Sequence, residues 1–111
     1  MIARLWRGKA SNAANAEAYA RHMTGTVFPS LESLAGNRGA LLLRRDVDGG
    51  SELLAVTFWE SRGSIQAFTG PDIGKSVVEA KARAVLSQFD DFAVHYEVVA
   101  ELPSPSAAAQ D

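Results

Sequence analysis

The strongest strand pattern in the chain covers residues 52–61, which read Glu-Leu-Leu-Ala-Val-Thr-Phe-Trp-Glu-Ser. Apolar residues occupy both of its alternating sets of positions. The two sets are Leu54, Val56 and Phe58 on one side, and Leu53, Ala55, Thr57 and Trp59 on the other. A strand that is apolar on both sides is typical of the middle of a sheet with two covered faces. We expect one face to lie under the chain's own helices and the other against a second copy.

The rest of the chain alternates between strand and helix patterns. Strands are predicted over residues 2–7, 40–45 and 92–99, and helices over residues 13–34, 64–68 and 75–89. Gly8 ends the first strand, and Gly25 and Pro29 predict a kink or break in the first helix. The sequence Asp-Val-Asp-Gly-Gly-Ser at residues 46–51 predicts a hairpin turn, because Gly and Asp tolerate positive φ.

The order β-α-β-β-α-β predicts an α+β fold of the ferredoxin-like class, with one antiparallel sheet and the helices on one of its faces. That topology leaves the other face of the sheet bare, and here the bare face carries too many apolar side chains for a monomer. A homodimer with its two sheets face to face, a dimeric α+β barrel, is the arrangement we expect.

Composition narrows the class of protein. The chain has 111 residues, 47% of them hydrophobic, which suits one domain over residues 1–100. Residues 101–111 are predicted to form a flexible tail or an arm on the partner. A net charge of −2 with scattered arginines does not favour nucleic acid. No apolar run is long enough to span a bilayer, so we expect no membrane partner and a cytoplasmic protein. The absence of cysteine excludes disulfides and thiolate catalysis.

Alternation along the strands sorts the candidate site residues by face. In the last strand, the apolar set is Phe92, Val94, Tyr96 and Val98. We expect this set to face the helices, which leaves Ala93, His95 and Glu97 on the open face. The predicted open-face set is Arg4, Trp6, Thr57, Trp59, His95 and Glu97. A slip of one residue in any strand would invert its faces.

The two histidines are the candidates for proton transfer. His95 could act as a general base or hold a phenol or enol proton, because its pKa lies near neutrality. The alternative is a half-buried histidine paired with Glu97 or Arg4. His22 lies near the end of the first predicted helix. It either interacts with the free backbone carbonyl groups at that helix end or reaches over the expected substrate cleft. His95 and Glu97 could begin a metal site, but we expect none, because a site needs at least three ligands and the sequence offers no third one apart from His22.

Trp59 could stack on a flat aromatic substrate, or it could be packed in the core or at a dimer interface. The chain contains no phosphate-cradling glycine motif, no nucleophile elbow and no His-Glu-x-x-His. Hydride, phosphoryl and acyl transfer by familiar motifs are therefore unsupported.

Several short patterns together resemble a known family. They are Ile-x-Arg-x-Trp-x-Gly at residues 2–8, Tyr19-x-x-His22, Pro29, residues 41–45, Thr57-Phe58-Trp59-Glu60-Ser61, Ile65-x-x-Phe68-x-Gly70 and His95-Tyr96-Glu97-Val98. This combination resembles the antibiotic biosynthesis monooxygenase family of the dimeric α+β barrel superfamily, over about residues 1–99. The resemblance implies a homodimer with a cavity between each sheet and the elements that cover it.

Some members of that family oxygenate polycyclic phenols without metal or flavin, and others degrade haem. Trp59 matches a site tryptophan of the first group, but Ala55 and Ile65 stand where that group has asparagine and tyrosine. For the haem degraders, Phe68 replaces a required tryptophan, and the iron-ligating histidine falls near Val78. Their first-strand asparagine falls near Arg7 or Gly8.

The resemblance thus implies a cofactor-independent monooxygenase acting on a small aromatic, phenol- or quinol-like molecule, with no cofactor expected. His95, Arg4 and His22 would be catalytic, and the substrate would contact Trp59, Trp6, Thr57, Phe68 and Glu97. Two alternatives stay open: a non-oxidative proton-transfer enzyme, such as a lyase, isomerase or cyclase, and a small-molecule-binding module without chemistry.

Overall fold

The structure is a computed structural model, and it describes residues 1–102. Its strands are β1 (Ile2–Ala10), β2 (Asn37–Val47), β3 (Gly50–Trp59), β4 (Gln88–Phe89) and β5 (Val94–Glu97). Its helices are α1 (Ala13–His22), the π-helical turn η1 (Met23–Val27), α2 (Phe28–Glu32), α3 (Arg62–Thr69) and α4 (Ala80–Val85). Most of the predicted tail, residues 103–111, lies outside the described residues.

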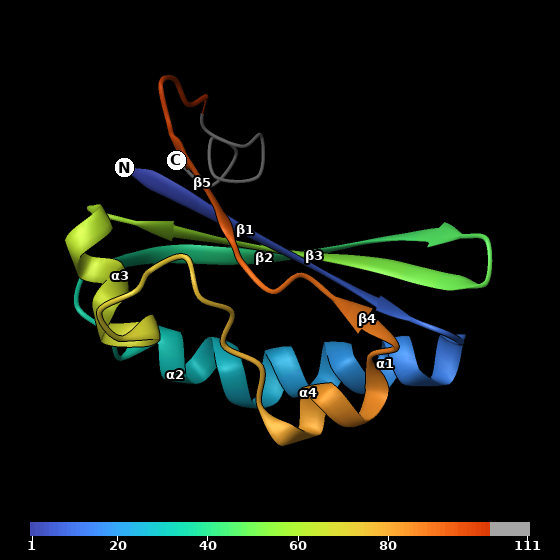
Figure 1. Ribbon diagram of the computed structural model, residues 1–111. Helices are drawn as coiled ribbons and strands as arrows, with labels where there is room; N and C mark the ends of the chain where they lie inside the picture. Colours follow the sequence, from blue (N-terminus) through green and yellow to red (C-terminus); the bar gives the residue numbers. More distant parts are fainter. Residues whose placement is uncertain (103–111) are drawn as a thin grey trace, which may run out of the picture.

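One antiparallel sheet organises these elements. Within residues 1–102 it has five strands in the order β2-β3-β1-β4, and β5 pairs with β1 on the same side as β4. The helices lie on one side of the sheet, and the other side carries no helix of the described chain (Figure 1). The predicted ferredoxin-like α+β fold is confirmed, with the last strand divided into two short pieces.

Local sequence signals explain the first half of the chain. The Asn12 side chain caps α1 by accepting a hydrogen bond from Asn15 N at 2.8 Å. The predicted kink is the π-helical turn η1, and Pro29 stands in the first turn of α2, where a missing N–H costs little. Gly50, the first residue of β3 after the β2–β3 turn, has φ 147°, and a Cβ there would clash with the Ala10 carbonyl oxygen. Only glycine allows this approach.

Several predicted strand boundaries are wrong. β2 covers Asn37–Val47 and not residues 40–45, and β3 covers Gly50–Trp59 and not residues 52–61. The first strand does not end at Gly8 but continues to Ala10, because β3 pairs with it along its whole length. The last strand is also shorter than residues 92–99, since regular pairing with β1 covers only Val94–Glu97.

The predicted helix over residues 75–89 is also wrong. Only residues 80–85 are helical, and the preceding segment, residues 70–79, is irregular and runs between α3 and α4 (Figure 1). We call residues 70–79 the covering segment. Its backbone hydrogen-bonds to the chain before β5: Ser76 N donates to Asp91 O at 3.1 Å, and Ala93 N donates to Gly74 O at 2.8 Å. These long-range bonds take the place of helical ones.

The sheet faces are the reverse of those expected. Arg4, Trp6, Thr57 and Trp59 are buried on the helix-covered face, and Ala93 is buried with them. The apolar set of β5 lies on the open face instead, with Phe92 65%, Val94 51% and Tyr96 57% exposed. The predicted set of residues does share one face, but this face is the one under the helices. Placing Trp59 at a sheet–sheet interface is therefore wrong, since Trp59 is 0% exposed within the single chain.

The core lies between the sheet and the helices, and its largest fully buried side chains are Trp59, Leu31, Leu53 and Ile65. No helix within residues 1–102 has the length and apolar character needed to cross a membrane.

Truncation of a core leucine tests this arrangement. Leu31→Ala, at a position 1% exposed, is expected to lower the free energy of unfolding. The loss should be about 2–5 kcal/mol, because it removes buried methyl groups and leaves a cavity. The matched control is Leu102→Ala, at a position 90% exposed. It should change the value by less than about 0.5 kcal/mol. Urea denaturation measures both, and equal effects would contradict the assignment of Leu31 to the core.

Candidate functional site

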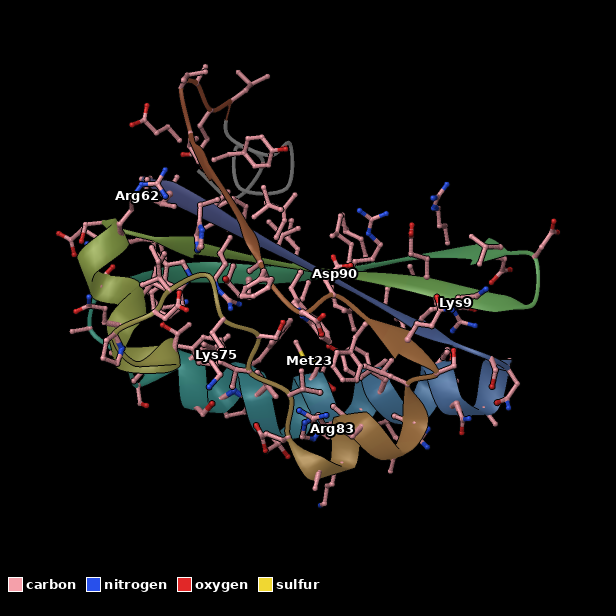
Figure 2. All side chains as sticks on the ribbon, viewed as in Figure 1. Lys9, Met23, Arg62, Lys75, Arg83 and Asp90 are labelled. Atoms are coloured by element: carbon pink, nitrogen blue, oxygen red, sulfur yellow. The ribbon has the colours of Figure 1, made fainter. Side chains whose placement is uncertain are left out.

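A small cavity lies between the sheet and the helices. It is lined by Arg4, Trp6, Tyr19, His22, Met23, Val27, Leu31, Ala55, Thr57, Phe68, Val77, Glu79 and Ala82. Figure 2 shows Met23 in the layer between the two. Only Val77 and Glu79 of these residues are exposed, so the cavity meets solvent at the end of the covering segment. Its volume, about 40 Å³ open to the centre of a water molecule, has room for only a few waters.

Arg4 places a positive charge at this cavity. It lies on β1 between Thr57 of β3 and His95 of β5, and its residue is 5% exposed. Its Nη2 donates to the Lys75 carbonyl at 2.9 Å, and its Nε donates to the Ile73 carbonyl at 3.4 Å. Its guanidinium carbon lies 5.5 Å from the centroid of the Phe68 ring. Burial lowers the pKa of Arg4 to about 10, which still leaves it charged at neutral pH.

His22 and Tyr19 reach the cavity from α1. They are three residues apart, so they share one face of the helix. His22 is 9% exposed, and its buried Nδ1 has no hydrogen-bond partner in the described chain. Burial raises the pKa of the Tyr19 hydroxyl above its usual value, so Tyr19 is a neutral phenol at physiological pH.

The aromatic side chains divide into lining and supporting groups. The Trp6 indole lines the cavity, and its Nε1 donates to Ser76 Oγ and to the Asp90 carbonyl, each at 2.8 Å. Trp59 lies behind the lining, where its Nε1 donates to Thr57 Oγ1 at 2.8 Å. The Trp59 ring stacks on Phe68 with centroids 6.0 Å apart. Phe68, and not Trp59, therefore presents an aromatic surface to the cavity.

Solved structures of the same fold are known. The heme-degrader MhuD from Mycobacterium tuberculosis has a TM-score of 0.61 and 22% identity, covering 93% of this chain and 100% of that chain. The monooxygenase ActVA-Orf6 of Streptomyces coelicolor, in complex with nanaomycin D, has a TM-score of 0.60 and 17% identity, and the match covers 93% of this chain and 92% of that chain. SnoaB, a cofactor-independent oxygenase from Streptomyces nogalater, has a TM-score of 0.58 and 16% identity, and the match covers 93% of this chain and 97% of that chain. The chain has the fold of the antibiotic biosynthesis monooxygenases. No protein-family profile and no curated protein matches its sequence.

Within this monooxygenase fold, five of the predicted site residues line the cavity: Arg4, Trp6, His22, Thr57 and Phe68. Three do not: Trp59 is buried behind Phe68, Glu97 is exposed at the sheet edge opposite Ile2, and His95 lies beside Arg4 on the neighbouring strand. Tyr19 was not among the predicted site residues. Its spacing from His22 on an apolar helix face was the signal for it.

No three His, Asp or Glu side chains within residues 1–102 are grouped as a metal site would require. His95 keeps a buried Nε2 without a hydrogen-bond partner in that part of the chain. Burial, and then the charges of Arg4 and Arg62, lower the pKa of His95 below 6.5. His95 is therefore neutral at physiological pH.

NMR titration of the imidazoles tests the contact between His95 and Arg4. His95 should titrate below 6.5, and Arg4→Gln should raise its pKa, because this change removes a neighbouring positive charge. As the pH falls through about 6.5, the unfolded chain takes up this proton before the folded protein does. His95 therefore lowers the free energy of unfolding as the pH falls below about 6.5, and it has no such effect at higher pH. The control Arg38→Gln removes an exposed arginine that pairs with Glu60, and it should leave the His95 pKa unchanged. A His95 pKa at or above 6.5 would refute the arrangement.

Proposed function

We propose that this protein is a cofactor-independent monooxygenase that acts on a small phenol- or quinol-like molecule in this cavity. The observation that supports it is a largely apolar cavity lined by Arg4, a cation with no ion-pair partner within residues 1–102, and by His22, whose buried Nδ1 has no hydrogen-bond partner in that part of the chain. An enolate held beside a cation in a site that excludes water is stabilised and electron-rich enough to react with oxygen.

In the proposed reaction, His22 is the base. It takes a proton from the substrate, either from the phenol O–H or from the ring CH₂ group of its keto tautomer. Both routes give the same enolate, whose negative charge is shared between the oxygen and a ring carbon. Arg4 stabilises the enolate oxygen. His95, the base expected from the sequence, does not line the cavity and is neutral beside Arg4, so we assign it a positioning role behind the arginine.

Oxygen then enters the reaction without a metal or flavin. The enolate carbon transfers electrons to O₂ and forms a C–O bond, which gives a peroxide. Loss of the second C–H proton and cleavage of the O–O bond leave a carbonyl group and hydroxide, which the proton on His22 converts to water. In sum, a CH₂ group and O₂ become C=O and H₂O, so the substrate supplies all four electrons needed.

Other lining residues would orient the substrate ring. Phe68 and Trp6 offer flat apolar surfaces, and the Tyr19 and Thr57 hydroxyls offer polar contacts. Glu97 and Trp59, predicted from the sequence as substrate contacts, have no direct role in this proposal, because neither lines the cavity.

Haem does not fit this cavity. MhuD is a heme-degrader of the same fold. Here Val78 stands near the position of the iron-ligating histidine implied by the resemblance, and valine has no ligand atom.

Oxygen consumption with anthrones, quinols and catechols tests the reaction on chelator-treated protein. The active substrate should show uptake that survives chelation. His22→Asn should reduce it by about 10²-fold or more, since a positioned base contributes about 10²–10⁴-fold. Arg38→Gln, away from the cavity, should retain full uptake.

The other outcomes separate the alternatives. Turnover under nitrogen that depends on His22 would indicate a proton-transfer enzyme such as a lyase, isomerase or cyclase. Binding of panel compounds without turnover in either atmosphere would indicate a binding module, and both results would refute the oxygenase.

We also propose a homodimer formed through the open face of the sheet. Strand register aligns one apolar row across that face: Leu41, Val56, Leu5 and Val94. Leu41 and Val94 are each 51% exposed in the single chain, and Leu43, Tyr96 and Phe92 extend the same apolar surface. Contact with a second sheet would remove this surface from water.

A charge within that row should disrupt the dimer. Val94→Asp is expected to shift the protein from dimer to monomer in light scattering coupled to sizing chromatography, because it would bury an unpaired carboxylate. Leu102→Asp places the same charge at a residue 90% exposed and outside the strands, and it should leave the dimer intact. A dimer that survives Val94→Asp at low micromolar concentration would rule out this interface.

A further inference from the structure

The Arg4 charge has no counter-ion in the described chain. Its guanidinium takes part in none of the ion pairs within residues 1–102, although its residue is only 5% exposed. The cavity has one carboxylate in its lining, Glu79, but this residue is exposed and forms no ion pair with Arg4. A buried charge is costly unless an opposite charge is brought to it.

Two of the three guanidinium nitrogens of Arg4 hydrogen-bond to the described chain, and the third does not. The carbonyls of Ile73 and Lys75 occupy Nε and Nη2, while Nη1 makes no hydrogen bond to any described residue. Both carbonyls belong to the covering segment, which is tied to the chain before β5 through Gly74 and Ser76. Neutral carbonyls fix the orientation of Arg4 without neutralising it, so a cation with free N–H donors stays fixed at the cavity.

We propose that the ligand of this cavity is an acid that binds as its anion, with an ionised carboxylate or enol oxygen on the free Nη1 side of Arg4. This inference rests on the proposed function for its choice of cavity, and it narrows the substrate class from neutral phenols to acids ionised at neutral pH. His22 supplies the second polar contact, since its Nδ1 is buried and without a partner in the described chain.

The size of the cavity sets the order of the probes. Acetate has about the volume of a few waters and should fit the cavity as it stands. An aromatic acid needs more room, and the exposed end of the covering segment, at Val77 and Glu79, is where the cavity can widen. Small and aromatic anions therefore test charge and size separately.

Calorimetric titration under nitrogen with matched pairs tests the inference. The pairs are acetate and acetamide, benzoate and benzamide, and a hydroxynaphthoquinone and its methyl ether. Each acid should bind about tenfold or more tighter than its neutral partner, because a charge-assisted hydrogen bond is about twice as strong as a neutral one. The carboxylate and enol pairs show which anion the cavity prefers.

Arg4→Gln should abolish the preference for the acid within each pair. Arg4→Lys should keep part of it, because lysine retains the positive charge but not the planar set of N–H donors. Arg38→Gln removes an exposed arginine and should leave all affinities unchanged. Circular dichroism of the free Arg4 variants shows whether each is folded. If Arg4→Gln is unfolded, Arg4→Lys decides.

Equal affinity within every pair, or no binding by any acid, would overturn the inference. The titration is run without oxygen, so that result does not test the oxygenase proposal, which the oxygen-uptake experiment tests separately. Conversely, anion binding without oxygen uptake would support the anion site and refute the proposed oxygenase function.

Discussion

The register of β1 decides which side chains meet under the helices. β3 pairs with the whole of β1 and β5 with its first half, and together they place Arg4 between Thr57 and His95. A slip of one residue would send Arg4 to the open face and bring Leu5 into the core. The far end of the β1–β3 pair leaves no space for a slip, because the Ala10 carbonyl lies where a side chain at Gly50 would be. The cavity and its charge both depend on this pairing.

Much of the fold could be predicted from the sequence, but the side of the sheet that carries the site could not. Alternation correctly grouped Arg4, Thr57 and His95 on one face, because period two is a local property of strands. The face was wrong because we assumed that the most apolar set of β5 must lie under the helices. Here the helix-covered face surrounds a cavity and has polar residues, while the open face has the apolar row. A strand face buried by helices and a strand face buried by a partner subunit both give alternating apolar residues, so the sequence alone does not distinguish them.

The covering segment shows a second limit of sequence reasoning. Val78, Ala82 and Val85 have helical spacing, and this predicted one long helix. In the structure, the first half is irregular and is bound by partners far away in the chain, which include the Arg4 guanidinium at Lys75 and the Trp6 indole at Ser76. Such contacts between residues about 70 positions apart leave no periodic signal. Tertiary hydrogen bonds therefore outweigh a modest helix propensity.

Stability alone does not account for the polar groups of the cavity. An apolar side chain of similar volume at residue 4 would fill the core without the cost of removing a charge from water. The buried Nδ1 of His22, which has no hydrogen-bond partner among the described residues, adds a second cost of about 1–3 kcal/mol. Both costs fall at one cavity, while the rest of its lining is mainly apolar. Unpaired polar groups that converge in this way are expected of a site that a ligand completes, since a protein accepts local instability where function requires it.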